Sequence, residues 1–135
     1  MTDNWTLVKK KIIDEVIIGF YEIARHDFLI GYHFRHIKDF DTHIPKIQRF
    51  WYLHLLKLST TERQVIIELG IPNNVINSHI YLKIKKGEIG RWVLLFKKVL
   101  EKYKEQDIEL IQQWNDEIEK FKDRFLNSKV LFGSD

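Results

Sequence analysis

Apolar residues recur every three or four positions along most of the chain, which is the spacing of one face of an α-helix. The first apolar stripe lies between residues 12 and 27 and consists of Ile13, Val16, Ile17, Phe20, Tyr21 and Ala24. Residues 27 to 41 have no clear period and are expected to form a short turn of helix and a loop. Because no segment alternates apolar and polar residues as a β-strand does, the pattern predicts an all-α protein.

A second long helix is expected to begin at Asp41 or Thr42. Pro45 falls in its first turn, where the missing N–H of proline costs little because that N–H would have no partner within the helix. The apolar face of this helix is expected to contain Ile44, Ile47, Trp51, His54 or Leu55, and Leu58. The pattern therefore predicts a helix that ends near Leu58.

A shorter helix is predicted to follow directly. Ser59 stands three positions before Glu62, which is the capping-box pattern of a helix N-terminus. Gly70 and Pro72 are residues that end helices. A brief helical segment that contains His79 is expected after this stop.

The C-terminal part of the chain predicts two more long helices. Residues 86 to 103 place apolar side chains on one side, and Asp107 is expected to cap the last helix. The apolar stripe of that last helix consists of Ile108, Ile111, Trp114, Ile118, Phe121 and Phe125. Two long early helices and two long late ones predict a single all-α domain of 135 residues, in which they pack against each other.

Composition narrows the range of functions. The chain has no cysteine, which excludes disulfides, thiolate metal sites and cysteine nucleophiles. Its 22 basic and 19 acidic residues are mixed along the sequence, whereas a nucleic-acid-binding face needs clustered positive charge. Neither a signal peptide nor an apolar run of about 18 residues is present, so a cytoplasmic protein is expected. Motifs for phosphate loops, zinc proteases, serine hydrolases and dinucleotide binding are also absent.

The six histidines are the remaining candidates for chemistry. His33 and His36 have the i, i+3 spacing that can hold a metal ion. In a loop with basic neighbours, however, a solvated pair is the simpler interpretation. Taken singly, His43 and His79 are each interpreted as half-buried structural residues.

Four residues on different segments indicate a function together that none of them indicates singly. Tyr21 lies on the first helix, His43 on the second, His79 on the brief segment and Trp92 on the next helix. Large aromatic residues surround these positions in the sequence, namely Phe34, Phe40, Phe50, Trp51 and Phe96. A flat apolar cofactor needs such a pocket, with one imidazole for its iron and a few polar groups opposite.

Five segments of the chain, in order, resemble those of the truncated haemoglobins, specifically group III. They are FY at 20–21, GYHF at 31–34, FDTHIPKIQRFW at 40–51, HIYLKI at 79–84 and RWVLLF at 91–96. Each segment is short, but their order and most of their spacings agree over roughly residues 12 to 125. The resemblance implies a truncated globin fold, a two-over-two helical sandwich that encloses haem b.

The resemblance also implies roles for particular residues. His79 matches the proximal ligand of the haem iron, and Tyr21 the tyrosine that stabilises a distal ligand. His43 matches the distal gate position, and Trp92 the tryptophan at the back of the distal pocket. Whether His43 donates a hydrogen bond or swings aside as a gate stays open.

Other residues are expected to surround the haem. Lys46, and with less support Arg91, match positions where a base meets a haem propionate. Phe34 matches the phenylalanine that packs on the haem plane, and Ile47 the apolar residue one turn after His43. The remaining expected contacts with the cofactor are Phe50, Ile84 and Phe96.

The function implied by the resemblance is binding of O2, NO, CO or other small haem ligands at a five-coordinate iron. Redox chemistry on NO, O2, nitrite or peroxide, similar to that of an NO dioxygenase or a peroxidase, is a further expectation. Since the sequence has no flavin or nicotinamide motif, the electrons would come from an unidentified external reductase.

Two alternatives and one departure from the family pattern remain. The chain is otherwise interpreted as a haem-free, globin-like interaction module, or as a small metal-binding protein that uses His33, His36 and His43. Trp51 and His79 are separated by 27 residues, several more than the family leads us to expect. The excess coincides with the capped segment near residues 60–72, which we interpret as an inserted helix.

Overall fold

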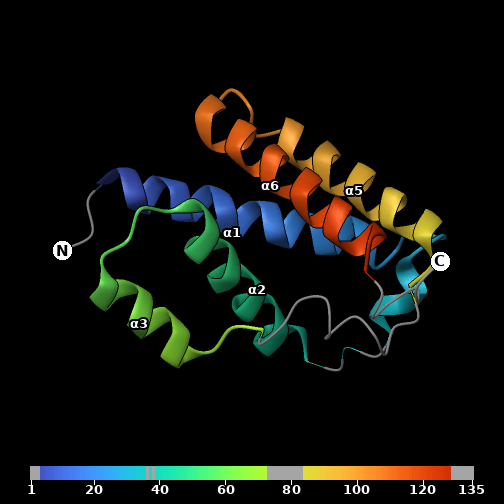
Figure 1. Ribbon diagram of the computed structural model, residues 1–135, viewed down its shortest axis with the longest axis horizontal. Helices are drawn as coiled ribbons and strands as arrows, with labels where there is room; N and C mark the ends of the chain where they lie inside the picture. The colour runs from blue at the N-terminus through green and yellow to red at the C-terminus, as the bar shows by residue number, and fades with distance from the viewer. Residues whose placement is uncertain (1–3, 36, 38, 73–83, 129–135) are drawn as a thin grey trace.

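The computed structural model describes residues 4–35, 37, 39–72 and 84–128 (Figure 1). Within these ranges every regular element is a helix, which confirms the all-α prediction. The elements are α1 (Asn4–Ala24), the 3-10 helix η1 (Gly31–Phe34), α2 (Phe40–Leu55), α3 (Thr60–Leu69), α5 (Lys86–Glu101) and α6 (Ile108–Leu126). None of the described helices has both the length and the apolar character that crossing a bilayer requires.

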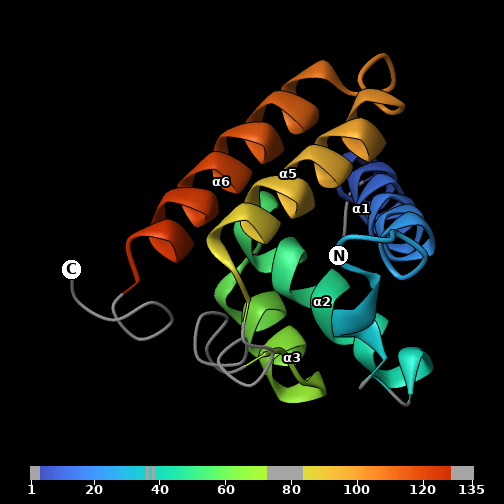
Figure 2. The same cartoon turned by 90° about the vertical axis from the view of Figure 1, so that its right-hand side faces the viewer.

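The long helices form two pairs. α5 and α6 lie side by side and run in opposite directions (Figure 1 and Figure 2). α1 packs against both α2 and α5, while α2 also contacts α3 and α6. The two pairs therefore meet around one core, and α3 lies at its edge.

The first helix differs from the prediction at both ends. It begins at Asn4 instead of residue 12, because residues 5–11 bury no side chain and so leave no apolar stripe in the sequence. Trp5, for example, is 76% exposed. The helix ends at Ala24 instead of residue 27, because Asp27 accepts hydrogen bonds from the N–H groups of Leu29 and Ile30 and starts a turn.

Caps explain the boundaries of the other helices. Asp39 accepts a hydrogen bond from the N–H of Thr42, so α2 begins at Phe40. This helix ends at Leu55, three residues before the predicted end, because Leu56 is extended. The predicted caps of the later helices are confirmed.

At those later caps, Ser59 and Glu62 form both bonds of a capping box at the start of α3. Gly70, which follows that helix, has a φ of 114°, a backbone conformation that favours glycine. The carboxylate of Asp107 accepts a hydrogen bond from the N–H of Leu110 and so caps α6. Local sequence therefore determines these three boundaries.

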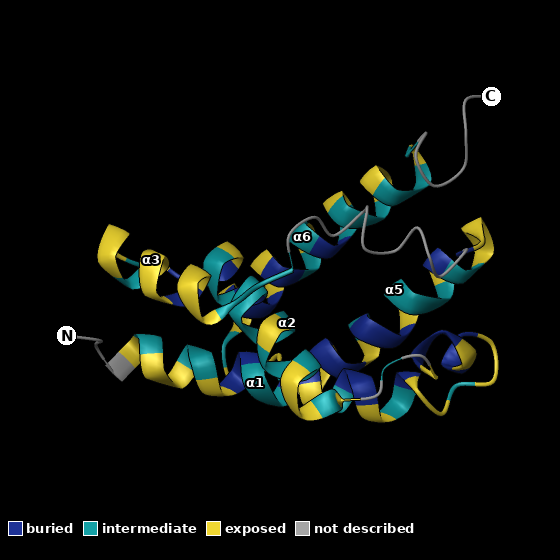
Figure 3. Ribbon diagram, turned by 90° about the horizontal axis from the view of Figure 1, so that it is seen from below, coloured by how far each residue is buried: buried dark blue, intermediate teal, exposed yellow. Residues whose placement is uncertain are grey.

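One aromatic ring from each long helix lies in the core. Phe20 of α1 and Phe96 of α5 have ring centroids 4.8 Å apart, and Trp51 of α2 lies 6.1 Å from Phe96. Trp114 of α6, which is fully buried, lies 5.4 Å from Trp51 and 5.5 Å from Phe96. Figure 3 shows buried residues along α1 and α5 and mainly exposed ones on α3. These four rings, the aromatic centre, hold the four helices together.

A close backbone approach places η1 under the end of α1. A Cβ atom at Gly31 would lie 2.8 Å from the carbonyl oxygen of Arg25, so the turn leaves no room for a side chain. The N–H of Gly31 donates to the carbonyl oxygen of Asp27 at 2.7 Å. Glycine at this position therefore allows the chain to turn back and present Phe34 to the core.

We expect Gly31→Ala to lower the free energy of unfolding by about 1–3 kcal/mol, the usual cost of forcing atoms into a packed site. Gly90→Ala is the matched control, because a Cβ at this exposed position on α5 meets nothing within 4 Å. Gly90→Ala should stabilise the protein by roughly 0.5–1 kcal/mol through helix propensity. Denaturant unfolding measures the free energy of unfolding of both variants. A Gly31→Ala protein as stable as wild type would show that the turn does not require glycine.

Candidate functional site

A cavity of about 520 Å³ lies beside the aromatic centre. Its walls come from α1, η1, α2, α5 and α6, together with residues that follow α3 and precede α5. Most of the lining side chains are apolar, and Phe20, Trp51 and Phe96 of the aromatic centre belong to both the core and the wall. Its volume lies in the range of about 300–1,000 Å³ that is typical of pockets for small molecules and cofactors.

Nearly all of the site residues predicted from the sequence line this cavity. Every one of them that the structure describes is on its wall, with the exception of Arg91. The aromatic members of the set are Tyr21, Phe34, Phe50, Trp92 and Phe96. The other members are His43, Lys46, Ile47 and Ile84. Five separate segments of the chain thus contribute predicted residues to one cavity.

Tyr21 and His43 form a polar pair on the wall. The hydroxyl of Tyr21 and Nε2 of His43 share a hydrogen bond of 2.8 Å, and their rings meet edge to face at 5.5 Å. Burial raises the pKa of Tyr21 well above its ordinary value. The phenol therefore keeps its proton at neutral pH and remains a hydrogen-bond donor.

Phe34 connects this pair to the opposite part of the wall. Its ring is 5.5 Å from Tyr21 and 5.8 Å from Trp92, with both contacts edge to face. Aromatic pairs in this geometry contribute about 0.5–1.5 kcal/mol beyond the area they bury. The wall from Tyr21 to Trp92 is consequently well packed.

His33 is a wall residue that the sequence interpretation missed. It was expected to be solvated, which is wrong, because the residue is only 2% exposed and lines the cavity. Its ring stacks on Trp92 at 6.0 Å, and Nε2 lies 3.1 Å from Oε1 of Glu88. That distance suits an ion pair. Basic residues nearby in the sequence gave no sign that the 3-10 helix turns this side chain inward.

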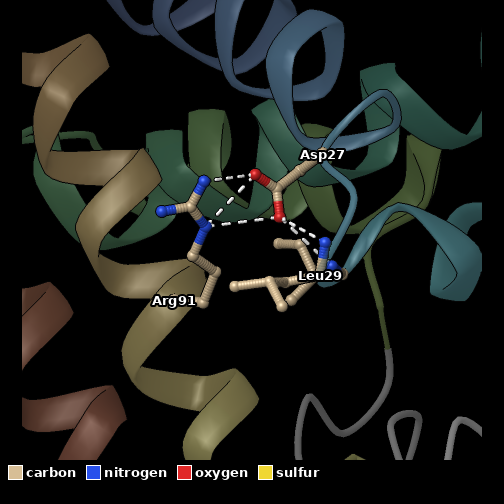
Figure 4. Close-up of polar contacts among 4 residues, drawn as sticks. Asp27, Leu29 and Arg91 are labelled. Carbon is tan, nitrogen blue, oxygen red and sulfur yellow. Dashed lines mark hydrogen bonds and ion pairs between the residues drawn. The ribbon is translucent and has the colours of Figure 1, made fainter.

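Arg91 binds Asp27 instead of facing the cavity (Figure 4). Its Nε lies 3.1 Å from Oδ1, and its Nη2 lies 2.5 Å from the same oxygen. The other carboxylate oxygen accepts from the N–H groups of Leu29 and Ile30. Asp27 therefore ties the turn before η1 to α5, and its hydrogen bond from Arg91 lowers the pKa of the Asp27 carboxyl.

α6 contributes wall residues that were not assigned to the site. Phe121 and Phe125 belong to the predicted apolar stripe of this helix, and their position beside Lys122 on the wall could not be read from spacing alone. Lys122 and Lys46, from α6 and α2, are the two lysines among the lining residues. The cavity therefore combines apolar walls with positive charge.

His79 lies outside the described residues. The residues on either side of its segment, Pro72 and Ile84, both line the cavity. Among the described residues, no group of three or more His, Asp and Glu side chains is arranged to hold a metal ion. The hypothesis of a metal site built from His33, His36 and His43 includes His36, which also lies outside those residues.

Comparison of the chain with models of protein families gives no match. No curated protein matches it. No solved structure matches it either. The resemblance to group III truncated haemoglobins thus stays a prediction from the sequence.

We expect Asp27→Asn to lower the midpoint of thermal unfolding at neutral pH, on the order of a few degrees. Because Arg91 holds the pKa of Asp27 below its ordinary value, the pair stabilises the fold above that value and loses this contribution as the pH falls through the lowered pKa. The difference from wild type should therefore shrink under acidic conditions. Asp116→Asn, at an exposed site on α6, is the control. An equal difference at all pH values would contradict the assigned role of the carboxylate.

Proposed function

We propose that the cavity binds haem b, with His79 as the axial ligand of the iron, and that the protein binds diatomic ligands there. One observation carries the proposal. Predicted haem contacts from five segments line the same apolar cavity, and the segment that contains His79 is joined to the wall at both ends, by Pro72 and Ile84. The globin-like sandwich inferred from the sequence is part of this proposal.

The chemistry of the wall suits a haem. A porphyrin is flat, apolar over its faces and acidic at one edge. Phe34, Trp92 and their neighbours offer aromatic surfaces for the faces, and Lys46 and Lys122 offer positive charge for the carboxylates. Imidazole is a common axial ligand for haem iron, which fits a role for His79.

A bound haem would supply an iron that can bind O2, NO or CO. The Tyr21 hydroxyl then has two possible hydrogen-bond partners. Its hydroxyl shares a hydrogen bond with His43 at 2.8 Å and, since it keeps its proton, can instead donate toward a small ligand in the cavity. His43 is placed to accept from Tyr21 or to turn away, so this pair controls how strongly a ligand is held.

We further propose that the protein carries out redox chemistry on NO, O2, nitrite or peroxide. Such chemistry consumes electrons, and the sequence has no flavin or nicotinamide motif. An external reductase would therefore supply them. The apolar side chains around Tyr21 and His43 lower the local dielectric constant, which strengthens the hydrogen bond between these two residues.

Titration of the protein with haemin tests the proposal. We expect a Soret band at one haemin per chain. His79→Ala should abolish it or weaken binding by more than roughly a hundredfold, since even the outer partners of a metal ligand contribute ten- to a hundredfold. His26→Ala removes an exposed histidine on the loop after α1 and should change nothing. If the wild-type protein gives no Soret band, haem binding is excluded and the haem-free interaction module is the better account.

The role of Tyr21 has its own test. Tyr21→Phe removes the hydroxyl and keeps the ring, so we expect O2 to dissociate roughly ten- to a hundredfold faster, as loss of a hydrogen bond of about 1.5–3 kcal/mol predicts. Stopped-flow mixing of the oxygenated protein with CO measures the rate. Tyr52→Phe is the control, because that hydroxyl donates to Asp14 on α1, away from the cavity. An unchanged rate in Tyr21→Phe would remove the hydroxyl from ligand binding.

A further inference from the structure

A buried, ionisable pair stands on the cavity wall apart from Tyr21 and His43. It consists of His33 on η1 and Glu88 on α5, with Nε2 of His33 3.1 Å from Oε1 of Glu88. The His33 side chain is almost fully buried and lines the cavity, while that of Glu88 is 12% exposed. The function proposed above does not use this pair.

The pair has a polar connection to solvent. The hydroxyl of Tyr32, a residue that is 38% exposed, donates a hydrogen bond to Glu88 Oε2. The backbone N–H of Lys85 donates to Oε1 of the same carboxylate at 2.8 Å. Tyr32, Glu88 and His33 therefore form a short row of polar groups that runs from the surface to the cavity.

Glu88 is held in its charged form. Burial alone would raise the pKa of its carboxyl, but the hydrogen bonds from Tyr32 and from the Lys85 N–H, together with His33 beside it, outweigh burial and lower that pKa. At neutral pH the charge of the pair consequently depends on His33. With neutral imidazole the pair carries one negative charge, and with imidazolium it carries none.

The other ionisable groups around His33 are bound to neighbouring side chains. Arg91 on α5 and Asp27 in the turn before η1 neutralise each other. On α1, Tyr21 keeps its proton. His43, on α2, is the other titratable group of this part of the wall, and it is bound to Tyr21 on the far side of Phe34. Among the described residues on this side of the wall, His33 is thus the histidine that lies directly beside a carboxylate.

We propose that His33 takes up a proton from solvent, through Tyr32 and Glu88, when a redox group in the cavity gains an electron. The inference rests on haem binding as proposed above. One electron arrives from a one-electron donor, such as a reduced flavin or dithionite. One proton leaves water and forms an N–H bond on His33. The added negative and positive charges cancel, which avoids the cost of an uncompensated charge in an apolar site.

The experiment measures the reduction potential of the haem-loaded protein as a function of pH. Coupling to one proton makes the potential fall as the pH rises, by up to about 59 mV per unit, because about 59 mV is a tenfold change in equilibrium constant for one electron. We expect such a slope in the wild-type protein. His33→Gln should have a slope well below that of wild type.

Two further variants complete the test. Glu88→Gln keeps the shape of the side chain and the histidine but removes the negative charge, so the sloping region should move to lower pH. Glu88→Gln therefore still tests proton uptake by His33 if His33→Gln fails to fold. His26→Gln, at an exposed histidine, should match wild type. A wild-type slope and pH range in both His33→Gln and Glu88→Gln would overturn the inference.

Failure of this inference is distinguishable from failure of the proposed function. If no Soret band forms with haemin, haem binding itself is wrong. If the band forms and the wild-type potential does not vary with pH, haem binding stands and proton uptake by His33 is excluded. A pH-indicator dye that reports proton uptake on reduction with dithionite gives an independent readout, with uptake expected in wild type and reduced in His33→Gln.

Discussion

Four aromatic rings, one from each of the helices α1, α2, α5 and α6, contact one another at the centre of the molecule. Phe96 lies within 6.1 Å of the three others, so it connects rings that come from both ends of the chain. Each contact adds about 0.5–1.5 kcal/mol to the burial of the rings themselves. These contacts join the four long helices at the centre of the core.

The cavity depends directly on this aromatic centre. Phe96 packs against Phe20, Trp51 and Trp114. Phe20, Trp51 and Phe96 also form part of the cavity wall. The packing of these rings in the core therefore also shapes the cavity wall. The Asp27–Arg91 pair holds the turn before η1 against α5. This places His33 and Phe34 of η1 on the cavity wall. Packing and one ion pair together thus build a preformed apolar site with a few polar groups.

Local sequence signals predicted the all-α class, the capping box at Ser59 and the start of the last helix, because caps and apolar stripes depend on neighbours three or four residues away. Tyr21 and His43 were placed in one site because the family resemblance linked segments that spacing alone does not connect. The pairing of Arg91 with Asp27, 64 residues apart, left no such signal. The burial of His33 was missed for the same reason: the stacking of Trp92 and the charge of Glu88 come from a distant helix.

The central claim is that this cavity is a haem site whose iron is held by His79. A crystal structure of the protein grown with haemin tests it most directly. The account predicts one haem in the cavity, with its iron bonded to the imidazole of His79 and with Tyr21 and His43 on the wall of the same cavity. A haem bound on the outer surface, or an iron ligated by another histidine, would contradict it.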